Sequence, residues 1–420
     1  MNSILIRNVR LDGNVTDVLI EGNRFRRIAP GITAEGARIV DGSGKAIVPP
    51  FYNTHTHAAM TLLRGYADDM ELFTWLNDYI WPAEAKLTGG DIYAGTRLAA
   101  LEMIRGGTVF FADMYWHQPD AARAVEETGL RASLGLLYIT GTDGDVLERN
   151  RHNNAALLEW NGGDTGRIQV AYGPHAVYTV SEPVLRQIAA DAAAHGGHRI
   201  HIHASETARE VDECIEAHGM SPVAWLDEVG LLGPQTILAH AVHLSDEDID
   251  LIRERGCWIA HCPCSNFKLA SGQFRYRQAV EIGCCRLTIG TDGCASNNNL
   301  SMLEEMKFAA LSAKGQSGDP TAGRDGDIFR AATRSGAEAF GIDAGVIGEG
   351  KLADAMLVDL DHPLLVPDYN LTANLVYAAD SSVIDTVVCD GRILMEHRKI
   401  DGEEEIIADA RRVCAKIRAL

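Results

Sequence analysis

The sequence predicts a (β/α)8 barrel combined with a small β-sandwich domain that both ends of the chain form. In the middle of the chain, short apolar segments alternate with segments whose apolar residues recur at helical spacing, which is typical of a parallel barrel surrounded by helices. Both ends of the chain instead contain short segments in which apolar and polar residues alternate. Several of the apolar segments end in His, Glu or Asp, and barrels of this kind carry their catalytic groups at the carboxyl ends of the strands.

The predicted small domain comprises residues 1–48 and 350–420. Its first part contains SILIRNVRL, DVLIEGNRFRRIAP and ARIVDGSG, which are separated by turns rich in glycine and asparagine. KLADAMLVDLD and VIDTVVCDGRILMEHRKI repeat this pattern late in the chain. The last segment, EEEIIADARRVCAKIRAL, has helical periodicity, and we expect it to close this domain as a helix.

The predicted barrel comprises residues 49–349. Segments such as PDAARAVEETGL, SEPVLRQIAADAAAH and SDEDIDLIRERG have the apolar spacing of the surrounding helices. The eight expected strands lie at residues 47–57, 107–115, 131–139, 167–175, 199–206, 236–243, 257–266 and 286–293.

Composition and charge limit the classes of function. A chain of 420 residues that is 46% hydrophobic is long enough for a large barrel and an accessory domain. The net charge of −20 argues against binding to nucleic acid or to an anionic membrane, but not against an uncharged nucleoside. The start MNSILIRNVRLDGN lacks the apolar core of a signal peptide, and the nine cysteines show no small-domain disulfide spacing. We therefore expect reduced thiols and a cytoplasmic location, while the number of chains that assemble stays open.

A metal site is predicted where His55 and His57 follow the first strand, in FYNTHTHAAMTLLRG. Side chains at positions i and i+2 of a strand point the same way, so both imidazoles can bind one ion; a polar turn with two histidines is the alternative. His203 and Asp292 stand at the ends of the fifth and eighth strands and complete a set of three nitrogens and one carboxylate. We predict one divalent ion with an open position for water, whose pKa falls from about 15.7 to roughly 7 on binding.

Three residues in or near this ligand set are candidates for handling protons and the attacking water. Glu206 follows His203 by three positions and can hand a proton to a ring nitrogen, although a helix-capping or salt-bridge carboxylate is the alternative. His240, at the end of the sixth strand, can hold and polarise the attacking water, and Asp292 can accept the proton of that water. The segment HCPCSN is interpreted as structural because its cysteines have C-x-C spacing, and KLASG after it is expected to form a loop over the pocket.

These segments together resemble the amidohydrolase superfamily, and within it the methylthioadenosine/S-adenosylhomocysteine deaminases. The motifs that carry the resemblance are PPFYNTHTHAAMTLLRG, GPHAVYTVS, HASE, LAHAVHLS, CSNFKLASG and IGTDGCASNNN. The resemblance implies a barrel flanked by a β-sandwich, Zn²⁺ (with Fe²⁺ or Mn²⁺ as alternatives) and hydrolytic loss of ammonia from an adenine ring. It implies metal ligands at His55, His57, His203 and Asp292, and substrate contacts from Trp75, Glu84, His175 and Glu206.

The segment around the expected substrate site adds detail. MELFTWLNDYIWPAEAKL is expected to form a helical lid, in which Trp75 alone would be read as a core residue and the Glu84 carboxylate can accept both hydroxyls of a ribose. Barrels that bind two metals carry a modified lysine at the end of the fourth strand, where this chain has His175 in VAYGPH. One ion is therefore favoured, with His175 left to contact substrate or to serve the structure.

The resemblance also locates a departure in the third strand. Members that act on S-adenosylhomocysteine have an arginine where this chain has Leu136, and a second one corresponds to Arg149 or to Arg151. Losing a buried partner of the substrate's carboxylate should cost about 1.5–3 kcal/mol. We therefore expect 5′-methylthioadenosine, 5′-deoxyadenosine or adenosine as substrates in preference to S-adenosylhomocysteine. The alternatives are a hydrolase of another ring (guanine, cytosine or a triazine) and a catalytically silent scaffold.

Overall fold

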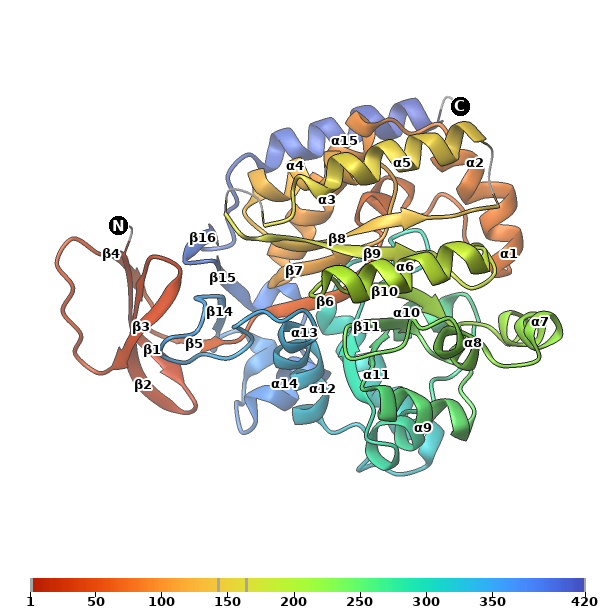
Figure 1. The fold of residues 1–420 in the computed structure, drawn as a ribbon. Helices are drawn as coiled ribbons and strands as arrows, with labels where there is room; N and C mark the ends of the chain where they lie inside the picture. Colours follow the sequence, from red (N-terminus) through yellow and green to blue (C-terminus); the bar gives the residue numbers. More distant parts are fainter. Residues whose placement is uncertain (1–2, 142–143, 163–164, 419–420) are drawn as a thin grey trace.

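The structure is a computed structural model that describes residues 3–141, 144–162 and 165–418. Eight parallel strands lie side by side in sequence order, and each falls within one of the eight predicted segments (Figure 1). The strands are β6 (Phe51–Thr56), β7 (Thr108–Asp113), β8 (Arg131–Tyr138), β9 (Ile168–Pro174), β10 (Ile200–Ala204), β11 (Thr236–His240), β12 (Trp258–His261) and β13 (Arg286–Ile289). The hydroxyl of Thr54 on β6 lies 2.8 Å from the hydroxyl of Thr288 on β13, so the first and last strands meet and nearly close the barrel.

Helices follow the strands and surround the barrel (Figure 1). Residues between β6 and β7 form α1 (Leu72–Thr74), a π-helical turn (Trp75–Ile80), α2 (Trp81–Glu84) and α3 (Gly89–Arg105). The following helices are α4 (Gln118–Thr128), α5 (Gly144–Leu158), α6 (Glu182–His195), α7 (Ala208–His218), α8 (Pro222–Glu228), α9 (Asp246–Arg255) and α10 (Pro263–Lys268). After β13 come α11 (Met302–Ser317), α12 (Asp325–Ala332) and α13 (Arg334–Ala339).

A second, mixed sheet combines strands from both ends of the chain (Figure 1). Its strands are β1 (Ser3–Leu11), β2 (Asn14–Glu21), β3 (Arg24–Ala29), β4 (Arg38–Asp41), β5 (Lys45–Val48), β14 (Ala355–Asp359), β15 (Ile384–Cys389) and β16 (Arg392–Met395). The amino-terminal and carboxyl-terminal strands join where β5 pairs antiparallel with β14, with Val48 opposite Met356. The barrel and a β-unit built from both termini, as the sequence predicted, are therefore confirmed.

The carboxyl-terminal helix α15 (Glu403–Arg418) lies away from this sheet (Figure 1). It packs on α3 of the barrel, where Lys416 Nζ lies 2.6 Å from Asp91 Oδ2 and Arg97 Nη1 lies 3.3 Å from Asp409 Oδ2. Val413 and Ile417 bury their apolar side chains in the same contact. The helix that the sequence analysis assigned to the small domain therefore also contacts the barrel, because helical periodicity gives the apolar face of a helix but not its partner.

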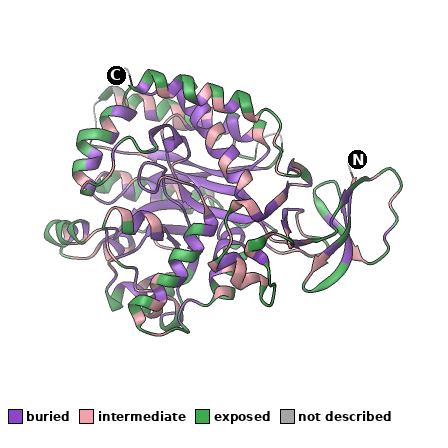
Figure 2. Ribbon diagram, turned by 180° about the vertical axis from the view of Figure 1, so that it is seen from behind, coloured by how far each residue is buried: buried purple, intermediate pink, exposed green. Residues whose placement is uncertain are grey.

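The strands of the barrel are buried, whereas exposed residues lie on the outer helices and on the strands and loops of the mixed sheet (Figure 2). Beneath the barrel, Arg131 Nε lies 3.0 Å from Asp354 Oδ2, and the Tyr52 hydroxyl donates to the same carboxylate at 2.9 Å. These buried contacts fasten the mixed sheet to the barrel. All nine cysteines are free thiols. Among the residues that the structure describes, no helix is both long and apolar enough to cross a membrane.

Candidate active site

The candidate site lies at the carboxyl ends of the barrel strands, where three polar residues have strained backbones. Ser205 after β10, His240 at the end of β11 and Asp292 after β13 have φ angles of 52°, 70° and 59°. This left-handed conformation is costly for residues with a side chain, by about 1–3 kcal/mol each, and tends to occur at functional sites. The sharp turns let each strand deliver its last side chain toward the barrel axis.

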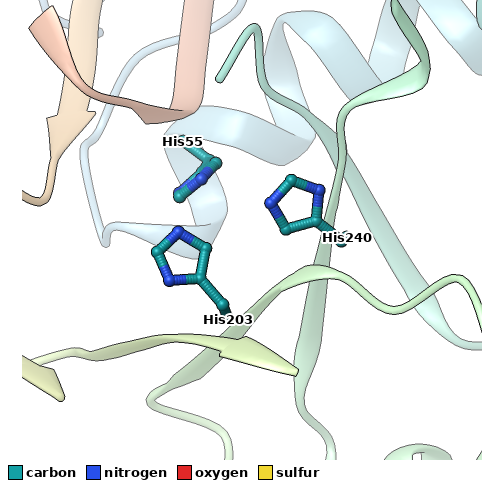
Figure 3. Close-up of side chains that lie close together, drawn as sticks. All are labelled: His55, His203 and His240. Atoms are coloured by element: carbon teal, nitrogen blue, oxygen red, sulfur yellow. The ribbon is translucent and has the colours of Figure 1, made fainter. Parts of the chain in front are cut away.

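The histidines predicted from the strand ends converge on one point. His55, His203 and His240 come from β6, β10 and β11, and Figure 3 shows their rings facing a common centre. The Nε2 atoms of His203 and His57 lie 3.3 Å apart. Asp292 Oδ1 lies 3.1 Å from His57 Nε2 and 3.3 Å from His55 Nε2. The three nitrogens and one carboxylate oxygen therefore surround a single position.

The other ring nitrogen of each expected histidine ligand is held from behind. His57 Nδ1 donates to the carbonyl oxygen of Met114 at 2.6 Å, and His203 Nδ1 donates to that of His175 at 2.7 Å. His55 Nδ1 lies 2.8 Å from Nε2 of the buried His201. Because a proton on Nδ1 leaves Nε2 with a free lone pair, these contacts orient all three rings as metal ligands.

Asp292 is fixed in a corresponding way. Its Oδ2 accepts hydrogen bonds from the hydroxyls of Ser265 at 2.6 Å and Ser296 at 2.7 Å. Its Oδ1 is left to face the histidines. The carboxylate is thus held so that one oxygen can bind an ion while the other stays anchored.

The charges of the site favour a cation at this centre. Burial lowers the pKa of His55 to about 4, although the hydrogen bond and charge of Asp292 oppose that shift. Burial also acts against protonation of His57, but Asp292 outweighs it and raises the pKa of His57 to about 9. Burial raises the pKa of Asp292, and the hydrogen bonds of His55 and His57 and the charges around it reverse this and hold that pKa well below its usual value. The carboxylate therefore draws positive charge into a buried pocket, which a divalent ion supplies.

A further observation also indicates that these side chains can hold a divalent metal ion. His55 Nε2 is buried at the centre of the cluster, 3.3 Å from Asp292 Oδ1, and forms no hydrogen bond of ordinary geometry with the described residues. In the described part of the chain, both groups of three ligand side chains that are close enough to share an ion belong to this cluster. Neither includes Cys262 or Cys264 of HCPCSN.

The proton-transfer candidates lie beside the metal ligands. Glu206 Oε2 is 3.8 Å from His240 Nε2, and Glu206 Oε1 accepts a hydrogen bond from the Ser271 hydroxyl at 3.2 Å. Burial raises the pKa of Glu206, so this carboxyl group holds a proton to higher pH than an exposed one. His240 is buried, which lowers its pKa, but the charges of Glu206 and Asp292 outweigh burial and raise it. Asn266 Oδ1 lies 2.8 Å from His240 Nδ1 and fixes the ring.

A pocket lies next to the metal-ligand cluster, and the helical segment after β6 forms part of its wall. Trp75 lines it and is anchored through Nε1, which donates to the carbonyl oxygen of Ala67 at 3.1 Å. Glu84 lines it too, and one of its carboxylate oxygens accepts from Trp116 Nε1 at 2.9 Å while the other, Oε1, is buried without a hydrogen-bond partner. His175 also lines the pocket, with Nδ1 2.9 Å from the Thr179 hydroxyl, and burial lowers the pKa of His175 to about 3.

A second cavity of about 390 Å³ adjoins the pocket and shares Trp81, Glu84, Trp116, Ile139 and Tyr178 with it. Arg149, one of the two arginines left open by the sequence, lines this second cavity. Its Nε atom is buried and has no hydrogen-bond partner among the described residues. Arg151 instead points outward, with a side chain that is 79% exposed and paired to Glu148 at 3.0 Å.

The sequence argument about the third strand needs a correction. Leu136 was expected in the substrate pocket, but its side chain packs in the core of the barrel. Leu137 and Ile139 line the pocket in its place. Both are apolar, so the pocket wall still lacks an arginine from this strand.

Several residues of the site were not found from the sequence. The aromatic walls (Trp81, Tyr115, Trp116 and Tyr178) and the supports (His201, Ser265, Ser271 and Ser296) belong to this group. Some signals were present, since Tyr115 and Trp116 directly follow β7, and His201 precedes His203 by the two positions that put both on one strand face.

Comparisons with known proteins agree with this geometry. The amidohydrolase family model matches residues 46–394. The 5′-deoxyadenosine deaminase of Methanothermobacter thermautotrophicus is 47% identical over 395 residues, which cover 93% of this chain and 91% of that one. The 5-methylthioadenosine/S-adenosylhomocysteine deaminase 1 of Archaeoglobus fulgidus is 44% identical over 99% of both chains. The crystal structure of an adenosine deaminase from Xanthomonas campestris with bound zinc is 33% identical, covers 100% of this chain and 99% of that one, and superimposes with a TM-score of 0.92. The chain belongs to the amidohydrolase family.

Proposed function

We propose that this protein is a metal-dependent deaminase of adenosine-type nucleosides, which converts the adenine ring to hypoxanthine and releases ammonia. The observation that carries the proposal is the buried carboxyl group of Glu206, 3.8 Å from His240, in a pocket that the metal-ligand cluster also lines. This pairing supplies an acid for the ring and a polar group for the water at one place. The identity of 47% to a 5′-deoxyadenosine deaminase supports adenine as the ring.

The residues divide the reaction between them. A divalent ion held by His55, His57, His203 and Asp292, which we propose to be Zn²⁺, would activate a water molecule at neutral pH. His240 orients the attacking oxygen at C6 and stabilises the negative charge that develops there. Asp292 takes up the proton of the water through Oδ1, since Ser265 and Ser296 already occupy Oδ2. Glu206 gives its proton to N1. The proton that Asp292 took up passes to the amino group, the C6–N bond breaks and ammonia leaves, and the remaining proton of the C6 hydroxyl returns to Glu206.

The ribose is assigned to Glu84 because one of its buried carboxylate oxygens has no partner in the pocket. We predict that Glu84→Gln lowers kcat/KM for 5′-deoxyadenosine by about 10- to 100-fold, since a hydrogen bond to a charged group is worth about 1.5–3 kcal/mol. 2′,3′-Dideoxyadenosine offers no such hydroxyls and should lose far less. Equal losses for the two nucleosides, measured by the absorbance change of deamination, would contradict the assignment.

The second cavity is the proposed place of the 5′ substituent. Phe73, Trp81, Trp116, Ile139 and Tyr178 give it a largely apolar wall, which suits a hydrogen, a hydroxyl or a methylthio group. Among the described residues that line this cavity, Arg149 is the one arginine. A carboxylated tail would therefore find a single charged partner at most.

The test of the proposed function is turnover of a substrate series by the metal-loaded protein. We predict that 5′-deoxyadenosine, 5′-methylthioadenosine and adenosine are deaminated, with kcat/KM for S-adenosylhomocysteine lower by about 10- to 100-fold because one charged contact is missing. Arg149→Met should reduce S-adenosylhomocysteine turnover further and leave 5′-deoxyadenosine unchanged. Turnover of guanine, cytosine or a triazine, without turnover of any adenosine, would overturn the adenine assignment.

A further inference from the structure

Glu210 is a buried acid that the proposed reaction leaves without a role. It lies in the first turn of α7, directly after the loop that carries Glu206, and only 2% of its surface is exposed. Burying a carboxylate costs folding free energy unless the carboxylate is well hydrogen-bonded. Glu210 lies about one helical turn from Glu206, the candidate proton donor, so its hydrogen bonds bear on the site.

The carboxylate of Glu210 binds two consecutive main-chain amides. Its Oε1 accepts from the amide of Ser205 at 3.0 Å, and its Oε2 accepts from the amide of Glu206 at 2.7 Å. The Glu210 amide in turn donates to the Thr207 hydroxyl at 3.1 Å, so the side chain reaches back across the start of its own helix. The two carboxylate oxygens of Glu210 thus hold the backbone amides of Ser205 and of Glu206 itself.

This turn needs such support. Ser205 has a φ of 52°, a conformation that a residue with a side chain adopts only when its surroundings impose it. The Ser205 carbonyl accepts from the amides of Val242 and His243 at 3.0 and 2.9 Å, which ties the turn to the loop after His240. Among the described residues, the Glu206 carboxyl group receives one side-chain hydrogen bond, the 3.2 Å contact from Ser271, so the backbone must supply most of its orientation.

We propose that Glu210 is a positioning residue, whose carboxylate clamps the Ser205–Glu206 backbone and thereby aims the Glu206 carboxyl group at the substrate ring. The inference rests on the proposed deaminase function for its kinetic consequence, but the clamp itself exists without substrate. Glutamine at this position keeps the shape and one acceptor oxygen, and it presents an amide donor to the second backbone N–H. The turn then loses one of its two clamps.

The first test is kinetic and uses metal-loaded protein with 5′-deoxyadenosine. We expect Glu210→Gln to lower kcat by about 10- to 100-fold with little change in KM or in bound metal, since a small misplacement of a catalytic group is that costly. The matched control is Glu216→Gln, an exposed acid on the same helix, which should match the wild type. A kcat of Glu210→Gln within twofold of the wild type would overturn the proposal.

A double variant separates positioning from a general loss of folded protein. If Glu210 acts through Glu206, the variant Glu206→Gln/Glu210→Gln should be no slower than Glu206→Gln alone. If Glu210 only maintains the fold, the two losses should multiply. Multiplied losses would overturn the positioning role.

Hydrogen exchange tests the clamp independently of turnover. In the wild type, the amides of Ser205 and Glu206 should exchange slowly. In Glu210→Gln, the exchange of residues 204–207 should rise, while the helix α7 that follows stays as protected as before. Unchanged exchange would contradict the clamp. Should the wild type deaminate no adenosine at all, the proposed function would fail, and the exchange measurement would still decide the role of Glu210.

Discussion

Replacing Glu206 by glutamine is expected to reduce kcat for 5′-deoxyadenosine by about 10²- to 10⁴-fold, the range that a positioned general acid contributes. Glutamine preserves the size of the side chain and can still accept a hydrogen bond from Ser271, but it cannot deliver a proton to N1. The measurement is ammonia release at saturating substrate, with bound metal determined on the same samples. Metal content should not change, because Glu206 lies outside the ligand set.

The pH profile gives this prediction a second readout. The acid must be protonated to act, and burial raises the pKa of Glu206, so activity should be retained below that raised pKa and fall as pH rises through it. The alkaline limb should be absent from the residual activity of Glu206→Gln. The control is Glu247→Gln, an exposed acid in the first turn of α9, which should keep both the rate and the limb. A Glu206→Gln enzyme with nearly normal kcat would show that another group protonates the ring.

The sequence predicted the barrel and the cluster because both depend on position within strands. His55 and His57 are two residues apart, and the strand period alone puts them on one face. Parallel strands end at the same edge of a barrel, so His203, His240 and Asp292 could be placed together without knowing any loop. The structure brings all of them to one centre.

The details that could not be predicted from the sequence depend on which face of a strand or helix a residue occupies and on the groups it contacts. β8 is buried on both faces and reads RASLGLLY, so no alternation of apolar and polar residues shows which leucine faces the pocket. The resemblance pointed to Leu136, and the structure puts Leu137 in the pocket wall. Arg149 and Arg151 are two positions apart on α5, which puts them about 200° apart around the helix, and only the packing shows that Arg149 faces the cavity. The clamp of Glu210 on two backbone amides follows from the left-handed turn at Ser205, which no residue type announces.

The loss of bound metal should have the largest effect on the protein. We expect exhaustive chelation to lower the rate of 5′-deoxyadenosine deamination below roughly 10⁻³ of its starting value, because no described side chain in the pocket can lower the pKa of water from about 15.7 toward neutrality. Added Zn²⁺ should restore the rate. It should also raise the midpoint of thermal unfolding, since an ion that binds only the folded state stabilises it.

A pair of buried histidines tests whether the ion lies where the four ligands meet. His203→Asn should lose both bound metal and turnover, since His203 Nε2 lies 3.3 Å from His57 Nε2 and its Nδ1 already donates to a backbone carbonyl. His261 is a buried histidine at the end of β12 whose Nδ1 has no partner among the described residues, and it belongs to neither ligand group, so His261→Asn should retain the metal. Metal analysis of the two purified variants, together with their rates, gives the comparison. Full metal content in His203→Asn would place the ion elsewhere, whereas loss of metal from the His203 variant alone would place it at the junction of β6, β10 and β13, where His55, His57, His203 and Asp292 meet.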